Sequence, residues 1–506
     1  MTDRHRLTRR GLLAGGMSAI AGLAFAEAPV SVPRPPLRAG SSAETLPPLG
    51  ETRPVAREEL AELVREAGLE GKVSIAVVEV GTGNVEAGFD EGLELPPASV
   101  AKALTALYAL EFLPPGHRFA TRLLATGPVR GGRIEGDLIL AGGGDPILVT
   151  DRLAELAQAL ARAGVREVGG FRVWGGALPQ FREITPEQLP WVGYNPSIGG
   201  LNLNFNRVHF EWARAGGDYR VRMEALGDYH RPEVSLARMR VVDRSLPVYS
   251  YEQDGDTDRW TVARGQLGDA GSRWLPVRVP DLYTGEAFVG LANEAGVVLP
   301  APTRIEALPE GLTEIARLES DPLEDILRDM LLHSTNPTAE IVGVAASVAR
   351  GIVPGSIAES AQAMNDWLQE ETGARFALVD HSGLGGESRV TAEEMVRVLA
   401  HAGVMERLWP ILKNIPLTDA GGNALRDPPG VVRAKTGTLN FATSLAGYAR
   451  TLKGTDLAFA YFSADVEARR RAADSQDEIP AGSREFLRRS RRLQQRLLQR
   501  WGLLSV

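Results

Sequence analysis

The chain has 506 residues, 44% of them hydrophobic and 24% charged, which is the composition of a globular protein with roughly two to four domains. It contains no cysteine, which excludes disulfides, thiolate catalysis and cysteine-ligated zinc, and its seven histidines form no metal-binding pair. The net charge is -8 with no basic block outside the two ends, which argues against a nucleic-acid partner.

The N-terminal residues have the pattern of an export signal. A basic start, MTDRHRLTRR, precedes a short apolar core and the small residues at 24–26, where a signal peptidase would cut. The Thr8-Arg9-Arg10 segment and the leucines after it resemble a twin-arginine signal, and a general secretory signal is the alternative. We therefore expect residues 1–26 to direct export to the periplasm and residues 27–55 to form a Pro-rich linker.

Folded structure is expected to begin near residue 56 with the helical pattern REELAELVREAGL. The next segment, KVSIAVVEV, alternates in polarity and is rich in β-branched residues, and a GTGN turn separates it from VEAGF. These features predict an antiparallel hairpin. From Ser99 to about Leu113 the sequence suits an almost purely apolar helix, which Pro114 and Pro115 end.

Lysine is scarce in this chain. Arginine supplies 51 of the 56 basic residues, and the five lysines are Lys72, Lys102, Lys413, Lys435 and Lys453. A chain that uses arginine for its surface cations is expected to keep lysine where an amine must lose its proton. Chance retention is the alternative explanation for any single lysine.

The first candidate site is the pair Ser99 and Lys102. Three residues of separation on a helix place the two side chains on the same face. Serine is a weak nucleophile until a neighbour takes its proton, and a lysine desolvated against an apolar helix has the lowered pKa that this task requires. The pair alone is a weak signal, because serine at a helix start is more often a cap.

Two later segments carry further polar residues in apolar surroundings. In LLHSTNPTAEIVGVAASVA, Pro337 is expected to keep Asn336 out of helical geometry and to expose Ser334, although an ordinary helix junction is the alternative. In VVRAKTGTLNFATSLAGYAR, a predicted strand carries Lys435 and the glycine Gly437, where a ligand backbone could approach closely. The segment DLAFAYFSAD is predicted to form the next antiparallel strand.

Together, Ser-x-x-Lys, Ser-x-Asn and Lys-Thr-Gly in this order resemble the three motifs of the penicillin-recognising serine enzymes, the penicillin-binding proteins and serine β-lactamases. The resemblance implies an α+β fold in which helices flank an antiparallel sheet. It also implies that Ser99 is the acylated nucleophile and that Lys102 is its general base.

The same resemblance implies roles for the other two motifs. Ser334 would relay a proton to the leaving group, and Asn336 would hold the substrate amide and orient Lys102. Lys435 would help to bind the terminal carboxylate of the substrate. The substrate-binding residues implied beside it are Thr436, Gly437 and Thr438, and the backbone N–H groups of Thr438 and Ser99 would form the oxyanion hole.

The spacing of the motifs favours one branch of this group. Ser99 and Ser334 are 235 residues apart, and strand-rich segments fill the interval. This large insertion resembles the low-molecular-mass class C penicillin-binding proteins, the D-alanyl-D-alanine carboxypeptidases and endopeptidases of peptidase family S13. The phrases PASVAKALTALYAL, GDLILAGGGDPIL, LNLNFNRV and DHSGLGG carry the resemblance over residues 56–465.

The family resemblance implies hydrolysis of D-alanyl peptide bonds in peptidoglycan through an acyl-enzyme, with penicillin as a covalent inhibitor and no metal or organic cofactor. A catalytic penicillin-binding domain is expected from residues 56–115 and 318–506. An inserted β-rich region is expected at 116–317, with a nested domain near 180–275. Because none of the motifs falls within the insertion, we expect it to be peripheral to bond making.

One departure concerns substrate choice. The family often has an acidic residue beside the tryptophan of EQLPWVGYNPSIGG, associated with a free amino group on the substrate, whereas Val192 and Gly193 follow Trp191 here. Preference for a diaminopimelate side chain is therefore left open. The sequence also leaves open the balance of carboxypeptidase and endopeptidase action and the oligomeric state.

Several alternatives accompany these predictions. A β-lactamase would share the acylating site, a transpeptidase would join strands, and an idle cell-wall-binding protein would keep the motifs without activity. The segment Asp380-His381-Ser382 has the letters of a triad but is expected to form a turn beside the site. The Arg-rich C-terminal helix is expected to pack on the sheet, with peripheral membrane contact as the alternative.

Overall fold

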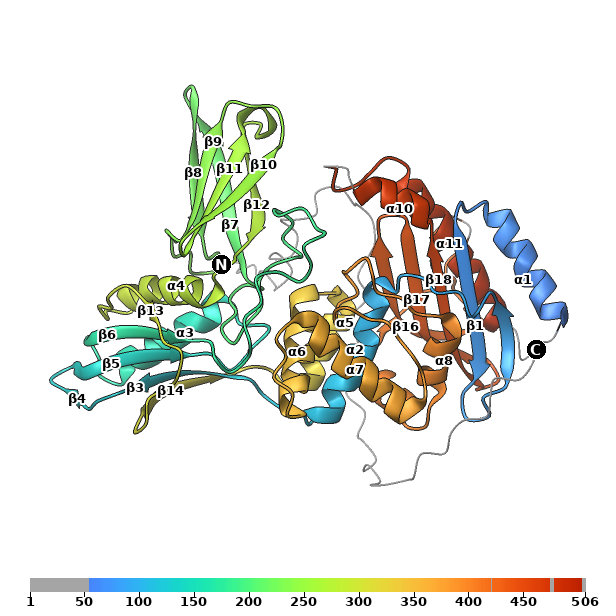
Figure 1. Cartoon of the computed structure of the whole chain (residues 1–506), viewed down its shortest axis with the longest axis horizontal. Helices are drawn as coiled ribbons and strands as arrows, with labels where there is room; N and C mark the ends of the chain where they lie inside the picture. The colour runs from blue at the N-terminus through green and yellow to red at the C-terminus, as the bar shows by residue number, and fades with distance from the viewer. Residues whose placement is uncertain (1–53, 420, 474–476, 503–506) are drawn as a thin grey trace, which may run out of the picture.

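The computed structural model describes residues 54–419, 421–473 and 477–502. The predicted export signal lies outside these residues, as does the predicted linker up to residue 53. Figure 1 shows two parts side by side: a motif domain, built from both ends of the chain, and an inserted region, built from its middle. The motif domain contains every segment that carries one of the three motifs.

A six-stranded antiparallel sheet forms the centre of the motif domain, in the order β15-β16-β17-β18-β1-β2. Its strands are β15 (Lys413–Asn414), β16 (Gly430–Leu439), β17 (Ala442–Thr451), β18 (Asp456–Ala464), β1 (Lys72–Glu79) and β2 (Val85–Phe89). The predicted hairpin is therefore confirmed as β1 and β2. Because β1 also pairs with β18, the N-terminal hairpin completes a sheet that the C-terminal strands begin.

Helices cover one face of this sheet and bury the motif segments against it. They are α2 (Ala101–Phe112), α5 (Leu323–His333), α6 (Asn336–Ala349), α7 (Ile357–Thr372), α8 (Ala392–Ala400) and α9 (Val404–Leu408). Helix α2 packs against α5, α6, α7 and α9, and every residue from Ala101 to Ala109 is buried. A helix enclosed on all sides must be apolar all round, which explains the nearly uninterrupted apolar run after Ser99.

The opposite face is covered by α1 (Pro54–Ala67) and α11 (Ser483–Gly502), and α10 (Val466–Ala473) lies near its end. Leu493, Leu497 and Trp501 of α11 are buried in one cluster with Ile75 and Phe459 of the sheet. The prediction that the C-terminal helix packs on the sheet is confirmed. Within the described residues, no helix is both long enough and apolar enough to cross a membrane.

The inserted region starts and ends at one antiparallel strand pair, β3 (Ala120–Ala125) and β14 (Thr313–Glu319). Its first sheet has the order β13-β6-β5-β3-β14, in which β5 (Arg133–Ala141) and β6 (Glu167–Trp174) are parallel. The crossover helix α3 (Thr150–Arg162) and the later helix α4 (Pro280–Glu294) share one core with this sheet. The short strands are β4 (Val129–Arg130), which pairs with β5, and β13 (Thr303–Arg304).

Two three-stranded sheets project from the inserted region in Figure 1. One sheet contains β12 (Ala270–Pro276), β7 (Arg207–Ala215) and β8 (Asp218–Glu224). The other contains β10 (Tyr249–Asp254), β11 (Thr257–Ala263) and β9 (Ala237–Val242). The chain between β6 of the first sheet and β7 contacts the motif domain on its way, at Asn336 and Gly386.

Candidate active site

Ser99 lies in a single 3-10 turn, η2 (Ala98–Val100), directly before α2. Ala98 has a φ of 47°, and the turn lies against β16 and β17. A Cβ atom at Gly437 of β16 would lie 2.9 Å from the carbonyl oxygen of Pro97 and 3.0 Å from the Cβ of Ala98. A glycine at position 437 therefore also allows the turn that carries Ser99 to lie close against β16.

Lys102 is fully buried, and its Nζ atom has three polar contacts. These are Ser99 Oγ at 3.0 Å, Asn336 Oδ1 at 2.8 Å and the carbonyl oxygen of Ser382 at 2.8 Å. Burial lowers the pKa of Lys102 to about 8, although the nearby carboxyls of Asp380 and Glu340 act in the opposite direction. A useful fraction of this amine is therefore uncharged near neutral pH.

The contacts of Lys102 also determine where its lone pair points. A neutral amine has two N–H groups and one lone pair, and the carbonyl oxygens of Asn336 and Ser382 can only accept hydrogen bonds. The Nδ2 atom of Asn336 donates to the carbonyl oxygen of Tyr194 at 3.0 Å, which turns Oδ1 toward Lys102. When both N–H groups are used in this way, the lone pair faces Ser99 Oγ.

Ser334 lies at the break between α5 and α6, in the left-handed region with a φ of 61°. Its Oγ accepts a hydrogen bond from Lys435 Nζ at 2.9 Å, and the same Nζ donates to the carbonyl oxygen of Thr436. Burial lowers the pKa of Lys435 well below its usual value, and the charges of Lys102 and Lys413 lower it further. The first and third motifs thus each provide a lysine that contacts a serine.

The expected geometry of Asn336 is wrong. Asn336 is the first residue of α6, and the break falls at Ser334 and Thr335 instead. Pro337 occupies the first turn of the helix, where its missing N–H group would have had no partner within the helix. The proline therefore starts α6 and does not interrupt it.

Alternation along β16 separates the side chains of the third motif. Lys435 and Gly437 share the face toward the Ser99 turn, while Thr438 accepts a hydrogen bond from Arg491 of α11 at 3.4 Å on the other side. Strand β15 pairs with β16 only at Arg433 and Ala434. In the described part of the chain, the edge of β16 after Ala434 has no strand partner, so its backbone groups suit an extended peptide.

Two buried carboxyls, Glu340 and Asp380, hold the loop behind Lys102, and of these Glu340 was not expected from the sequence. The Glu340 oxygens accept from the backbone N–H groups of His381 and Ser382 at 3.0 and 2.9 Å. Asp380 accepts from the N–H groups of Gly383 and Gly385. Burial raises the pKa of both carboxyls, that of Glu340 to about 8. A lone glutamate within the apolar sequence of α6 was the available signal.

The Asp380-His381-Ser382 segment forms a turn beside the site, as predicted. His381 lies against Ser360 at 2.8 Å, and burial lowers its pKa to about 3, so its ring is neutral. His381 contributes to the site through its backbone N–H, which donates to Glu340. The carbonyl oxygen that contacts Lys102 belongs to the next residue, Ser382.

Two further residues near the site were not identified from the sequence. Tyr194 belongs to the inserted region, which therefore contacts the second motif directly although it contains no motif of its own. Lys413 lies on β15 and adds positive charge near Lys435. The scarcity of lysine pointed to all five lysines alike, and three of them, Lys102, Lys413 and Lys435, lie here. Nothing in the local sequence marks Tyr194.

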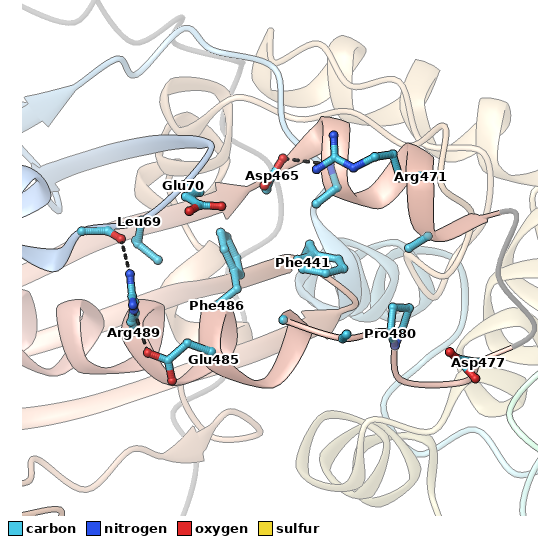
Figure 2. A pocket seen from close by; sticks show the side chains of 15 residues that line it. Leu69, Glu70, Phe441, Asp465, Arg471, Asp477, Pro480, Glu485, Phe486 and Arg489 are labelled. Carbon is cyan, nitrogen blue, oxygen red and sulfur yellow. Dashed lines mark hydrogen bonds and ion pairs between the residues drawn. The ribbon is translucent and has the colours of Figure 1, made fainter.

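A hollow of about 460 Å³ lies apart from these residues, between α10, α11 and the segment before β1 (Figure 2). Phe441 and Phe486 line it together with charged side chains such as Glu485 and Arg489, which pair with each other. None of the motif residues lines this hollow. The described residues also contain no group of three or more His, Cys, Asp or Glu side chains that could hold a metal ion.

Sequence comparison places residues 56–482 in the family described as "D-Ala-D-Ala carboxypeptidase 3 (S13) family". The chain is 27% identical over 442 residues to a D-alanyl-D-alanine carboxypeptidase from an Actinomadura species, an alignment that covers 80% of each chain. It is 25% identical over 404 residues to the D-alanyl-D-alanine carboxypeptidase DacB of Haemophilus influenzae, covering 74% of this chain and 83% of the relative.

The fold is also similar to a solved structure. The crystal structure of penicillin-binding protein 4 from Haemophilus influenzae superposes with a TM-score of 0.69 at 20% sequence identity. The match covers 87% of this chain and 99% of the other. This likeness confirms the predicted α+β fold of helices around an antiparallel sheet with a large insertion.

Proposed function

The chain belongs to the D-Ala-D-Ala carboxypeptidase 3 (S13) family, and from this membership we propose that it hydrolyses D-alanyl-D-alanine bonds of peptidoglycan peptides through an acyl-enzyme on Ser99. It is a serine-type carboxypeptidase with the fold of a penicillin-binding protein. One observation carries the assignment of roles: the Nζ atom of buried Lys102 lies 3.0 Å from Ser99 Oγ, with its other contacts made to acceptors.

In the proposed acylation step, Lys102 takes the proton of the Ser99 hydroxyl while Oγ attacks the carbonyl carbon of the penultimate D-alanine. The C–N bond to the terminal D-alanine breaks, and Ser334 relays to the departing amine the proton that Lys102 took from Ser99, which leaves Lys102 neutral again. The acyl group remains on Ser99 as an ester. Water then attacks that ester with Lys102 as the base, releasing the shortened peptide and restoring the Ser99 hydroxyl.

The oxyanion of the tetrahedral intermediate is assigned to the backbone N–H groups of Ser99 and Thr438. The contact between Ala98 and Gly437, the residues just before them, supports this assignment because it brings the two backbones together. Lys435 and Thr436 are assigned to the terminal carboxylate of the substrate. Lys413 adds a second positive charge near Lys435.

Penicillin enters the same scheme as a covalent inhibitor. Attack by Ser99 Oγ opens the β-lactam amide, and the leaving nitrogen stays attached to the acyl group. Endopeptidase action would use the same steps on a cross-link in which the D-alanyl amide joins two peptides. The acylating site is common to all three reactions, so the products must be measured to separate them.

The test is to incubate the purified protein and a Ser99→Ala variant with a peptide ending in D-alanyl-D-alanine and with cross-linked muropeptides. Mass spectrometry should show free D-alanine, or separated peptides, only with the unchanged protein. A fluorescent penicillin should form a long-lived adduct. Rapid penicillin turnover would indicate a β-lactamase, joined peptides a transpeptidase, and absence of labelling an idle wall-binding protein.

We propose in addition that the protein works in the periplasm after export. The support is the basic and apolar pattern of residues 1–26 and a substrate that lies outside the cytoplasm. Cell fractionation of the full chain and of a form lacking residues 1–26 tests this. Replacing Arg9 and Arg10 by lysine should block export only if the twin-arginine route is used.

A further inference from the structure

We propose that the inserted region forms part of the catalytic apparatus through one segment, residues 181–198, here called the bridging loop. The loop fixes the amide of Asn336 so that Lys102 keeps its lone pair for Ser99, and Arg278 is the positioning residue that holds the loop. This inference rests on the proposed function, because it concerns the proton transfer in the same site.

The bridging loop is a closed unit with its own internal contacts. Phe181 and Ile198 exchange backbone hydrogen bonds of 3.0 Å in both directions, so its two ends meet. Within it, the buried side chain of Asn195 accepts from the N–H groups of Ile184 and Thr185 and donates to the carbonyl oxygen of Thr185. A loop held by its own polar groups presents its backbone in one conformation.

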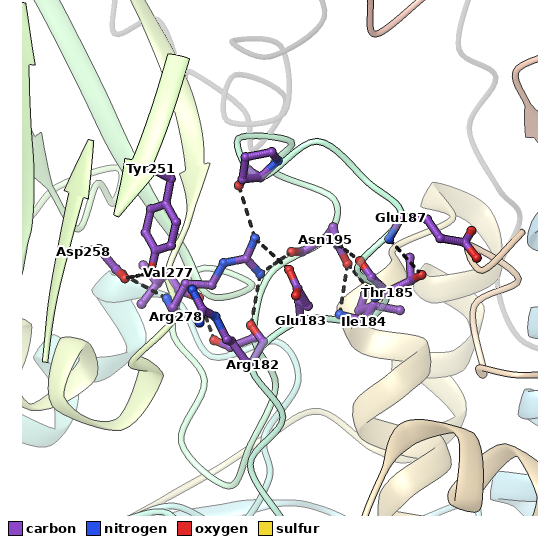
Figure 3. Close-up of polar contacts among 12 residues, drawn as sticks. Arg182, Glu183, Ile184, Thr185, Glu187, Asn195, Tyr251, Asp258, Val277 and Arg278 are labelled. Carbon is purple, nitrogen blue, oxygen red and sulfur yellow. Dashed lines mark hydrogen bonds and ion pairs between the residues drawn. The ribbon is translucent and has the colours of Figure 1, made fainter. Parts of the chain in front are cut away.

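Arg278, which follows β12, fastens the bridging loop from inside the inserted region (Figure 3). Its guanidinium donates to the carbonyl oxygens of Arg182 at 3.0 Å, Asn195 at 2.8 Å and Pro190 at 3.2 Å, and Glu183 lies 3.5 Å away. The residue is only 3% exposed. A buried arginine with three carbonyl acceptors is costly to loosen, because each lost contact would leave a buried polar group unpaired.

The other side of the bridging loop makes polar contacts with the motif domain. The carbonyl oxygen of Tyr194 accepts from Asn336 Nδ2 at 3.0 Å. Glu187 accepts from the backbone N–H of Gly386 at 2.8 Å, and Trp191 Nε1 donates to Glu478 at 2.9 Å. Arg278 holds the carbonyl of Asn195, so it fixes the peptide unit directly after the one whose oxygen meets Asn336.

The orientation of the Asn336 amide decides whether the lone pair of Lys102 stays free to take the Ser99 proton. If the amide turned over, its Nδ2 would face Lys102 and could donate to the lone pair of the neutral amine. That lone pair would then be unavailable for the Ser99 proton. The carbonyl oxygen of Tyr194 favours the productive orientation, because it requires a donor and cannot bond to Oδ1. The other charged groups near Lys102 are Glu340, Asp380 and Lys435.

The experiment measures the limiting rate of acylation and the half-saturating concentration for a fluorescent penicillin, with end-point labelling giving the active fraction. Arg278→Met should lower the limiting rate by about tenfold or more, with a much smaller change in half-saturation. Arg278→Lys should recover part of the loss. Arg264→Met removes a partly exposed arginine of the inserted region that pairs with Asp218 and Asp243, and should match the unchanged protein.

A double-mutant cycle decides whether Arg278 acts through Asn336. In an Asn336→Ala background, Arg278→Met should cost less than about twofold in limiting rate, because the group it positions is already absent. A merely structural role would lower the active fraction but not the limiting rate after correction for that fraction. The inference is overturned if the corrected limiting rate of Arg278→Met equals that of the unchanged protein. It is also overturned if the loss caused by Arg278→Met multiplies in full with the loss caused by Asn336→Ala.

If Arg278→Met does not fold, Glu187→Ala takes its place, because Glu187 is an exposed residue of the bridging loop whose side chain joins the loop to Gly386 of the motif domain. We expect Glu187→Ala to lower the limiting rate by about threefold, an effect that disappears in the Asn336→Ala background. An effect that persists there would contradict us.

The proposed function fails separately, if the unchanged protein is neither labelled by penicillin nor able to release D-alanine. If it does both and the loop variants equal it, only the loop inference fails.

Discussion

The Nζ atom of Lys102 lies 3.0 Å from the Oγ atom of Ser99, and both belong to one continuous helical segment of which Lys102 is fully buried. The nucleophile and its proposed base are therefore set by local geometry, before any contact with the rest of the molecule. What the rest of the molecule supplies is the orientation of the amine and its lowered pKa. Both effects lead to predictions.

The pH dependence of acylation should follow Lys102. Because burial lowers its pKa to about 8, and only the neutral amine accepts a proton, the rate of penicillin labelling should rise with pH and level off above about 8. The measurement is the labelling rate at a subsaturating penicillin concentration from about pH 6 to about pH 10. A rate that is already constant below pH 7 would show that the base is neutral there and is not this lysine.

Gly437→Ala should displace the turn that carries Ser99. The new Cβ atom would lie 2.0 Å from Ser444 Oγ and 2.9 Å from the carbonyl oxygen of Pro97, so the turn or the strand has to move. We expect acylation to fall by about tenfold or more, because a small displacement of a nucleophile is costly. Gly217→Ala, at a turn where a Cβ meets nothing within 4 Å and where φ lies outside the left-handed region, is the control for a general effect of removing a glycine. Equal labelling by the two variants would contradict the prediction.

The residues of the site differ in how visible they are in the sequence. The three motifs lie in short segments with distinctive polar residues, so Ser99, Ser334 and Lys435 could be chosen and their convergence expected. The hairpin and the C-terminal helix could be predicted because their apolar periodicity is local. The Tyr194 carbonyl could not, since any residue has a carbonyl and only the folded path of the bridging loop brings this one to Asn336.

The error at Asn336 has a different origin. A proline disfavours helix in the residue before it, but it also suits the first turn of a helix, and the sequence does not show which effect dominates. The structure starts α6 at Asn336, so the amide extends from a rigid helix. At Gly437 the need for close approach could be predicted, whereas the proximity of the Ser99 turn depends on the fold and could not.

Glu340→Gln should destabilise the protein and slow acylation. Each oxygen of the buried Glu340 carboxyl accepts one backbone N–H, from His381 and Ser382, and a glutamine would place an NH2 group against one of these donors. Leaving a buried donor unpaired costs about 1–3 kcal/mol of unfolding free energy. Chemical unfolding of the variant measures this cost, with the exposed glutamate of α7 replaced in Glu371→Gln as the matched control.

The Ser382 carbonyl gives Glu340→Gln a second readout. Because that carbonyl accepts a hydrogen bond from Lys102, a shift of the turn should also lower the labelling rate of the fraction that remains folded. Unchanged stability together with unchanged labelling would mean that the carboxyl does not hold the turn. Loss of stability alone would limit Glu340 to a structural role.

The two motif lysines should respond differently to arginine. Lys102 has to accept a proton, and an arginine, with a pKa above about 12, cannot do so at neutral pH. Lys102→Arg should therefore reduce acylation to the level of Ser99→Ala within assay error. Lys435 donates to Ser334 and is assigned to the carboxylate of the substrate, and arginine partly reproduces these contacts although its planar group is larger.

Lys435→Arg should accordingly keep measurable acylation, with the loss expressed mainly as weaker substrate capture. The measurement is the second-order rate of fluorescent penicillin labelling for Lys102→Arg, Lys435→Arg and Ser99→Ala, each first shown by circular dichroism to be folded. Lys453→Arg is the matched control, because Lys453 lies in the turn between β17 and β18 and is exposed. If Lys102→Arg labels as fast as Lys435→Arg, an arginine suffices at position 102, and the proton of Ser99 must be taken by another group.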